Sequence, residues 1–433
     1  MKDENTLYWL WLAAKCGVAS KQFDRIIEKY EDPFDVYGLT DDEIEQMEGI
    51  NSTLKAKLCQ KDLEGSYAIL RYCKENRVDI ITYGDRRYPL RLKNTVDPPI
   101  LLYCLGHFPD FNSLLCIGMV GTRKMSEYGK QSAYRIGYEL ASAGAVVVSG
   151  MALGVDGAAS CGALSAGGST VAVLGSGISV VYPKEHKRLM DEIAKHGAVI
   201  TEYPPNEPPY GHNFPKRNRI ISGLCQGVLV IEGAKGSGAM ITARRAIDQG
   251  REVFAIPGKI DDINSYVPNE LIREGAYPAL CSEDILGHYD FLYGDVIDRV
   301  KLSKAQRKIT DGDVDKALKK YGVVSKKHTM GKSKAKEDVD EDFSPDAEQE
   351  TVAETIKEAP VAGNGAADES IALIETLDGF TRQVFEAIPI DKAISPDVLA
   401  AQGFDVSAAV TALTMLELYG LVSALPGGLY IRK

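Results

Sequence analysis

A short basic segment carries the most informative chemistry in this chain. It runs FPKRNRIISGL from Phe214 to Leu224, and its charged and amide side chains are Lys216, Arg217, Asn218 and Arg219. The chain as a whole is acidic, with 61 Asp and Glu residues against 50 Lys and Arg residues. Three cations within four positions of an acidic chain are therefore not background charge. They predict an anion site, and a polyanion is the ligand that such a cluster favours.

Glycine-rich turns follow four of the predicted strands and form the second part of this chemistry. Their polar or glycine positions include Gly121, Thr122, Arg123, Ser149, Gly150, Lys235, Ser237 and Gly238, with a further Gly-Ser-Gly at 175–177. Carboxyl ends of parallel strands meet at one edge of a sheet, where glycine lets the backbone approach a ligand. One such turn is weak evidence, because any tight connection requires glycine. Four turns together with Arg123 and the basic segment predict a phosphate-binding groove.

The elements that must position these turns lie between about residues 110 and 285. Strand-length runs rich in Val and Ile alternate there with helical stretches: SLLCIGMVG, GAVVVSG, STVAVLG, HGAVITE, GVLVIEG and REVFAIPG. This alternation is typical of a parallel sheet covered by helices on both faces. We therefore expect an α/β core domain over residues 81–300, with a small extension of the sheet from the segment 79–106.

Two further folded segments are expected at the ends of the chain. Residues 1–80 carry apolar side chains at helical spacing, and 45–58 has the outline of a helix-hairpin-helix. The turn of that motif lacks its usual second glycine, which favours a packing module over a DNA clamp. Residues 369–433 fit a winged helix, with a tight turn at 426–428. Its expected third helix offers no cation, which favours protein interaction over DNA reading.

Between the core and the winged helix, residues 301–368 lose their apolar periodicity. They are poor in aromatic residues, and their charge comes in blocks, basic first and acidic after. This composition predicts a disordered charged linker, with a short helix possible near VDKALKKYG.

The sequence contains few candidate catalytic residues or cofactor-binding motifs. The run GSGISV lacks the third glycine of a dinucleotide fingerprint, and Ala239 occupies the position where a phosphate loop requires lysine. Asp156, Glu202 and Glu232 are isolated carboxylates, expected to orient amides or tie loops together. His212 is expected to be an exposed loop residue. We therefore expect no catalytic residue and no cofactor.

The cysteines and the first residues bear on metal binding and location. Eight cysteines are scattered without metal-ligand spacing, which favours reduced thiols and no metal site. The acidic start and short apolar stretch of MKDENTLYWLWLAAK differ from a signal peptide or a membrane span. A cytoplasmic protein without a membrane partner is expected.

Several ordered motifs resemble the DprA/Smf family of DNA-processing proteins of natural transformation, over about residues 80–285. They are VGTR (120–123), SGMALGVD (149–156), AVLGSGISVVYP (172–183), FPKRNRIISGL (214–224) and EGAKGSGAMITARRAIDQGREVFAIPG (232–258). The resemblance implies an extended Rossmann-like core, a SAM-like or helix-hairpin-helix-like N-terminal domain and a C-terminal winged helix. It also implies a homodimer without enzymatic activity that binds and protects incoming single-stranded DNA without sequence preference. Such a protein loads RecA recombinase and displaces single-strand-binding protein.

By this resemblance, Arg123 and Lys216 are the leading phosphate contacts. Arg217 and Arg219 either contact DNA or brace the loop through Asn218 and neighbouring carboxylates. Phe214 either stacks on a base or is a buried anchor that positions Lys216. The sequence departs from the family at 237–240, where SGAM replaces SGSL, and at Pro268, where glycine is common. These departures put contacts near both positions in doubt.

Two other functions stay open at this point. A nucleotide-processing enzyme resembling the phosphoribohydrolases would use a glutamate that the comparable run KGSGAMITAR (235–244) lacks. A structural adaptor would recruit partners through its winged helix, with DNA binding residual.

Overall fold

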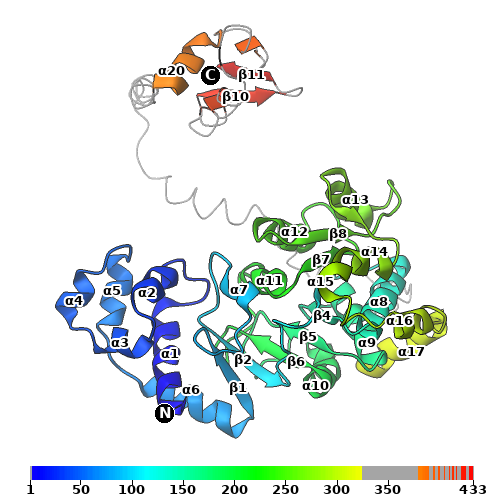
Figure 1. Cartoon of the computed structure of the whole chain (residues 1–433), viewed down its shortest axis with the longest axis horizontal. Coiled ribbons are helices and arrows are strands. Elements are labelled where there is room, and N and C mark those ends of the chain that lie inside the picture. Colours follow the sequence, from blue (N-terminus) through cyan, green and yellow to red (C-terminus); the bar gives the residue numbers. More distant parts are fainter. Residues whose placement is uncertain are drawn as a thin grey trace, which may run out of the picture. The chain divides into compact units, whose positions relative to one another are not determined.

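The computed structural model of the chain describes residues 2–323, 379–389, 394, 398, 399, 404, 409, 412, 413, 416, 421–425 and 429–432. Internal contacts divide the chain into two units, residues 1–345 and 346–433, and each is described by itself (Figure 1). Most of the expected linker, the turn at 426–428 and the polar positions of the expected third helix of the winged helix lie outside the described residues. Within the described part of the chain, no helix is long and apolar enough to cross a membrane.

The first 75 residues form a helical module. Its helices are α1 (Lys2–Cys16), α2 (Phe23–Lys29), α3 (Pro33–Gly38), α4 (Asp41–Glu45), α5 (Ser52–Leu58) and α6 (Glu64–Glu75). Thr40 and Glu43 form a capping box that starts α4, and the Asn51 side chain accepts the Leu54 amide at 2.8 Å to start α5. Trp9 and Trp11 are buried in a separate apolar core of this module.

A nine-stranded sheet forms the core of the first unit. Its strands are β1 (Val78–Thr82), β2 (Leu101–Gly106), β3 (Cys116–Val120), β4 (Val146–Ser149), β5 (Thr170–Val173), β6 (Ala198–Thr201), β7 (Gly227–Val230), β8 (Glu252–Ala255) and β9 (Tyr277–Pro278). They lie in the order β1-β2-β6-β5-β4-β3-β7-β8-β9. All pairs from β6 to β9 are parallel, whereas β1–β2 and β2–β6 are antiparallel. The predicted parallel sheet and its extension from 79–106 are confirmed.

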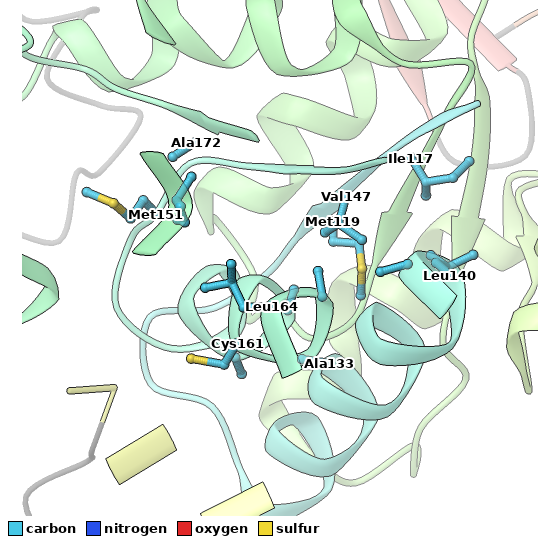
Figure 2. Packing of buried hydrophobic residues seen from close by; sticks show 14 of the residues in the cluster. Ile117, Met119, Ala133, Leu140, Val147, Met151, Cys161, Leu164 and Ala172 are labelled. Carbon is cyan, nitrogen blue, oxygen red and sulfur yellow. The ribbon is translucent and has the colours of Figure 1, made fainter. Parts of the chain in front are cut away.

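Helices cover both faces of this sheet, as the alternation of strands and helices predicted. One face carries α8 (Glu127–Ser142), α9 (Val155–Ser165) and α10 (Lys187–His196). The other carries α7 (Leu90–Lys93), α11 (Asn213–Leu224), α12 (Gly238–Asp248) and α13 (Tyr266–Arg273). Figure 2 shows Ile117, Met119 and Val147 of the strands among side chains of α8 and α9. Cys116 and Val120 belong to the cluster on the opposite face, so the strands are apolar on both sides.

The strand order places a topological switch point at β3. From β3 the chain proceeds outward through β4, β5 and β6, then returns to pair β7 with the other side of β3. Neighbouring connections therefore leave the sheet toward opposite faces at the carboxyl ends of β3 and β7. In open α/β sheets this is the place where ligands bind.

Residues 301–323 are folded, although the sequence analysis placed them in a disordered linker. Three small helical elements follow β9: α14 (Ser282–Leu286), α15 (Asp290–Tyr293) and α16 (Arg299–Gln306). The next helix, α17 (Asp311–Tyr321), buries Val314 and Leu318 in the core cluster of the first unit. Ion pairs fasten α17 to α8 at Lys130–Asp315, 2.8 Å, and Arg135–Asp311, 2.7 Å. Residues 301–323 are thus folded, and the short helix expected near VDKALKKYG is present.

The described part of the second unit contains a helix and a hairpin. The helix is α20 (Gly379–Ala387), and β10 (Val422–Leu425) pairs antiparallel with β11 (Leu429–Arg432). Ile394 makes an isolated bridge to Tyr430 of the hairpin. Buried side chains from both parts, among them Phe385 and Val422, form one cluster. A helix packed on a terminal hairpin agrees with the predicted winged helix.

Candidate nucleic-acid interface

Three strand-end loops meet at the switch point. The Thr122 amide donates to the Glu232 carbonyl at 2.8 Å, and the Val155 amide donates to the Thr122 carbonyl at 3.2 Å. The loops after β3, β4 and β7 are thereby joined through their backbones. Gly154 has a φ of +79°, and a Cβ added there would lie 2.3 Å from the Thr122 oxygen. Only glycine permits this approach.

Arg123 projects from this junction beside the Phe214 ring, which in turn packs against the Tyr182 ring. The side chain is exposed, and its guanidinium carbon lies 5.5 Å from the centroid of the Phe214 ring. The Tyr182 ring is 5.3 Å from the Phe214 ring and is 40% exposed. Phe214 itself is half-buried and packs over Gly175, where a Cβ would approach the ring to 2.8 Å. Phe214 therefore supports an accessible cation and an accessible ring.

Arg217 is a brace and not a surface contact. Its side chain is 4% exposed. Nη1 donates to the carbonyls of Gly150, at 2.9 Å, and Val173, and Nε donates to Oδ1 of Asn218 at 3.1 Å. Burial lowers the pKa of Arg217 to about 10, with Asp156 opposing the shift, so the side chain remains charged at neutral pH. Of the two roles left open for Arg217, these contacts support bracing of the loop through Asn218 and not a DNA contact. Asn218 is half-buried, and its predicted DNA contact stays a prediction.

Arg219 is likewise buried, on a different set of partners. Its side chain is 2% exposed; Nη2 bonds to the Glu202 carboxylate and Nε lies 3.4 Å from Asp97 Oδ2. Burial opposes the charge, yet Glu202 and Asp97 together hold the pKa of Arg219 above its ordinary value. Glu202 also accepts the amide of Ala19 at 3.3 Å, which ties in the helical module. Of the two roles left open for Arg219, these partners support bracing through neighbouring carboxylates and not a DNA contact.

Asp156 organises the loop after β4. Its carboxylate accepts the amides of Gly150, at 3.0 Å, and Ala152, at 3.4 Å, as an amide-orienting group should. Burial raises the pKa of Asp156, and the nearby Arg217 opposes that rise. Ser149 is fully buried, and a Cβ at Gly150 would lie 2.5 Å from the Arg217 guanidinium. The predicted DNA contacts at Ser149 and Gly150 are therefore wrong, because both residues are buried inside the protein.

Glu232 occupies the N-terminus of α8. Its carboxylate accepts the Ser126 amide at 2.9 Å and the Ser126 hydroxyl, and Ser126 is the N-cap residue of that helix. The end of the helix dipole is therefore neutralised by the protein's own carboxylate. This agrees with the prediction that Glu232 ties loops together, and it removes α8 as an anion site.

The turn before α12 is open by contrast. Lys235 and Gly238 are exposed, Ser237 is the N-cap residue, and no side chain caps the helix. The first turn of α12 contains no acidic residue. Its free amides and Lys235 are thus available to an anion. Lys216, on the first turns of α11, is exposed as well.

The accessible part of the predicted site is therefore smaller than the basic sequence motif. Its members are Gly121, Thr122, Arg123, Lys216, Lys235, Ser237 and Gly238, all exposed or half-buried. Sequence reasoning missed Asp97, whose role depends on a long-range contact with Arg219. No cluster of His, Cys, Asp and Glu suited to a metal ion occurs in the described part of the chain.

The burial of Arg217 yields a stability prediction. We expect Arg217→Ala to lower the free energy of unfolding by about 2–4 kcal/mol, because it leaves two buried carbonyls without a donor. Arg123→Ala is the matched control and should change it by less than about 0.5 kcal/mol, since that side chain is exposed. Urea denaturation of the unmodified protein and the two variants measures these changes in the free energy of unfolding. Equal stability of the two variants would show that Arg217 does not brace the loop.

Comparison with known proteins agrees with this architecture. The profile of a family described as DNA recombination-mediator protein A matches residues 79–290, and that of the DprA winged helix domain matches residues 370–428. The solved structure of DNA processing protein A from Streptococcus pneumoniae superposes with a TM-score of 0.57 at 37% identity. That match covers 65% of this chain and 97% of the other. The predicted Rossmann-like core and winged helix are thereby confirmed.

Two relatives show how far the similarity extends in sequence. DNA processing protein DprA of Bacillus subtilis is 39% identical over 236 residues, which is 54% of this chain and 80% of the relative. DNA processing protein DprA of Streptococcus pneumoniae is 43% identical over 207 residues, covering 48% of this chain and 73% of the relative. The chain therefore belongs to the DprA/Smf family of DNA-processing recombination mediators.

Proposed function

We propose that this protein binds single-stranded DNA without sequence preference, in the groove at the carboxyl ends of β3, β4 and β7. The observation that carries the proposal is the exposed Arg123 beside the Phe214 ring, which packs against the partly exposed Tyr182 ring. Single strands are held by cations that follow the backbone and by aromatic side chains on which bases stack. Neither kind of contact selects a sequence.

The proposed contacts divide into side chains and backbone. Arg123, Lys216 and Lys235 supply charge to phosphates, and the uncapped amides around Gly238 at the start of α12 supply hydrogen-bond donors. Arg217 and Arg219 do not contact the strand in this proposal. They are buried and hold the loop after β4 and the start of α11 in place. A locally positive groove on a chain of net charge −11 concentrates the field where the strand lies.

We also propose that the protein acts as a recombination mediator, which requires protein partners. In the cytoplasm, the protein protects incoming DNA, displaces single-strand-binding protein and loads RecA recombinase on the strand it holds. Membership of the recombination-mediator family supports this role. A recruiting surface on the winged helix is compatible with it, and the adaptor function then becomes one part of the mediator role.

A homodimer is the assembly that fits an exposed apolar segment of the first unit. Leu280, Phe291 and Leu292 follow the edge strand β9 within a short stretch, and their exposed fractions are 79%, 97% and 74%. Large apolar side chains gathered on a surface mark interaction sites. We propose that this segment pairs with its own copy, since two-fold contacts use the same patch on both chains.

Salt-titrated binding tests the DNA groove. The double variant Arg123→Ala/Lys216→Ala should bind a single-stranded oligonucleotide roughly tenfold or more weakly than the unmodified protein. Its slope of log affinity against log salt should fall by about 1.4, since each phosphate contact on a single strand contributes about 0.7. Lys195→Ala, an exposed lysine of α10 paired with Glu192, is the control and should leave both values unchanged. Unchanged affinity of the double variant would exclude the groove.

Recombinase assembly tests the mediator role. On single-stranded DNA coated with single-strand-binding protein, the unmodified chain should shorten the lag in RecA-dependent ATP hydrolysis several-fold. The Arg123→Ala/Lys216→Ala variant should not, because loading requires that the mediator hold the strand. A lag that is equal with and without the unmodified protein would rule out loading.

Sedimentation equilibrium tests the dimer. Phe291→Arg/Leu292→Arg should shift the protein to monomer, because two cations in an apolar contact are desolvated without partners. Leu90→Arg is the control: Leu90 is also exposed, but it lies on α7. The proposal fails if the double variant and the control have the same association constant.

A further inference from the structure

A cavity of about 330 Å³ lies between the N-terminal helical module and the α/β core. The helical module lines it with apolar side chains of α1 and α6, including Leu10, Ala13 and Ile69. The core lines it with the end of β6 and the start of α11, including Tyr203, His212 and Lys216. Both parts belong to the same compact unit. The cavity therefore joins a module without an assigned role to a helix that carries a proposed phosphate contact.

The exposed lining residues of the cavity include groups that can bind a nucleotide. Lys216 and His212 are exposed and lie one helical turn apart at the start of α11. The His212 ring stacks on the Tyr210 ring, with centroids 5.7 Å apart and an angle of 8° between the planes. A cation next to a flat stacked pair is the combination that holds one phosphate and one neighbouring base of a single strand.

The interior selects against the phosphate and for the base. The Glu207 carboxylate lies among the lining residues, so an anion that entered would meet like charge, whereas the Glu202 carboxylate is already paired with Arg219 and the Ala19 amide. The apolar wall from α1 and α6 suits the faces of an aromatic ring, and the Glu207 carboxylate can accept hydrogen bonds from its N–H groups. A volume of about 330 Å³ lies at the small end of ligand sites. One base fits this chemistry, and a phosphate does not.

We propose that this cavity receives a single base of the bound strand while Lys216 holds the adjacent phosphate. The inference rests on the proposed single-stranded DNA binding, and it makes the helical module one wall of the DNA site. The helix-hairpin-helix outline in residues 45–58 takes no part, since the cavity is lined by α1, α6 and the loop at Gly17 and Val18.

Blocking the cavity from the side of the module tests the proposal. Ala14 lines the cavity, is exposed and belongs to α1, so Ala14→Trp fills space without altering a core residue. Ala14→Ser is the control at the same position. Each protein is titrated with a normal oligonucleotide and with one of equal length and charge whose central nucleotides are abasic. Thermal unfolding verifies that each variant is folded, and Val18→Phe is a second block from the adjacent loop.

Ala14→Trp should weaken binding of the normal oligonucleotide by about fivefold or more, the effect of losing one stacked base. It should leave binding of the abasic oligonucleotide and the salt slope unchanged, and Ala14→Ser should behave as the unmodified protein. The inference is overturned if Ala14→Trp and Val18→Phe bind both oligonucleotides as tightly as the unmodified protein. Equal weakening of both oligonucleotides also overturns it. Should the unmodified protein bind neither one, the proposed function fails, and the cavity assignment fails with it.

Discussion

The burial of the Arg217 charge is the interaction on which the loops of the proposed DNA groove depend. A buried guanidinium must have its donors satisfied and a negative charge nearby. Arg217 donates to the carbonyl of Gly150 directly after β4, to the carbonyl of Val173 at the end of β5 and to the Asn218 side chain, and Asp156 of α9 is the nearby negative charge. Asp156 in turn holds the amides of Gly150 and Ala152. One charge thereby fixes two strand ends and requires glycine at position 150.

A second buried cation, Arg219, joins other segments of the first unit through two carboxylates. Arg219 of α11 meets Glu202 after β6 and Asp97 of the connection before β2, and Glu202 accepts the amide of Ala19. Replacement of such pairs by apolar residues is often neutral for stability, whereas removal of one partner is costly. The arrangement therefore defines one orientation of the helical module against the core. That orientation creates the cavity beside Lys216.

The sequence predicted the class of the fold better than the accessible surface of the site. Apolar strand runs and their glycine ends identified the sheet and the position of Arg123, because these patterns are local. The charge of the basic segment predicts surface contacts for all three cations. The spacing of Arg217, Ile220, Ile221 and Leu224, however, is that of a buried helix face. That spacing was the signal that Arg217 points inward. The same holds for α17, where lysines obscured the spacing of Val314, Leu318 and Tyr321. The contact of Arg219 with Asp97 had no local signal.

The return of the chain from β6 to β7 has a consequence for synthesis. β3 gains one of its two neighbours only when β7 is available, since Ile117 pairs with Gly227 and Val120 with Val230. A nascent chain that ends before β7 leaves the edge of β3 unpaired and open to other strands. It also lacks Glu232, whose carboxylate accepts the amide of Ser126 at the N-terminus of α8, so the proposed groove is incomplete in a partial product. Distant pairing of this kind slows folding. The loops of the proposed DNA site are thus assembled only together with the complete sheet.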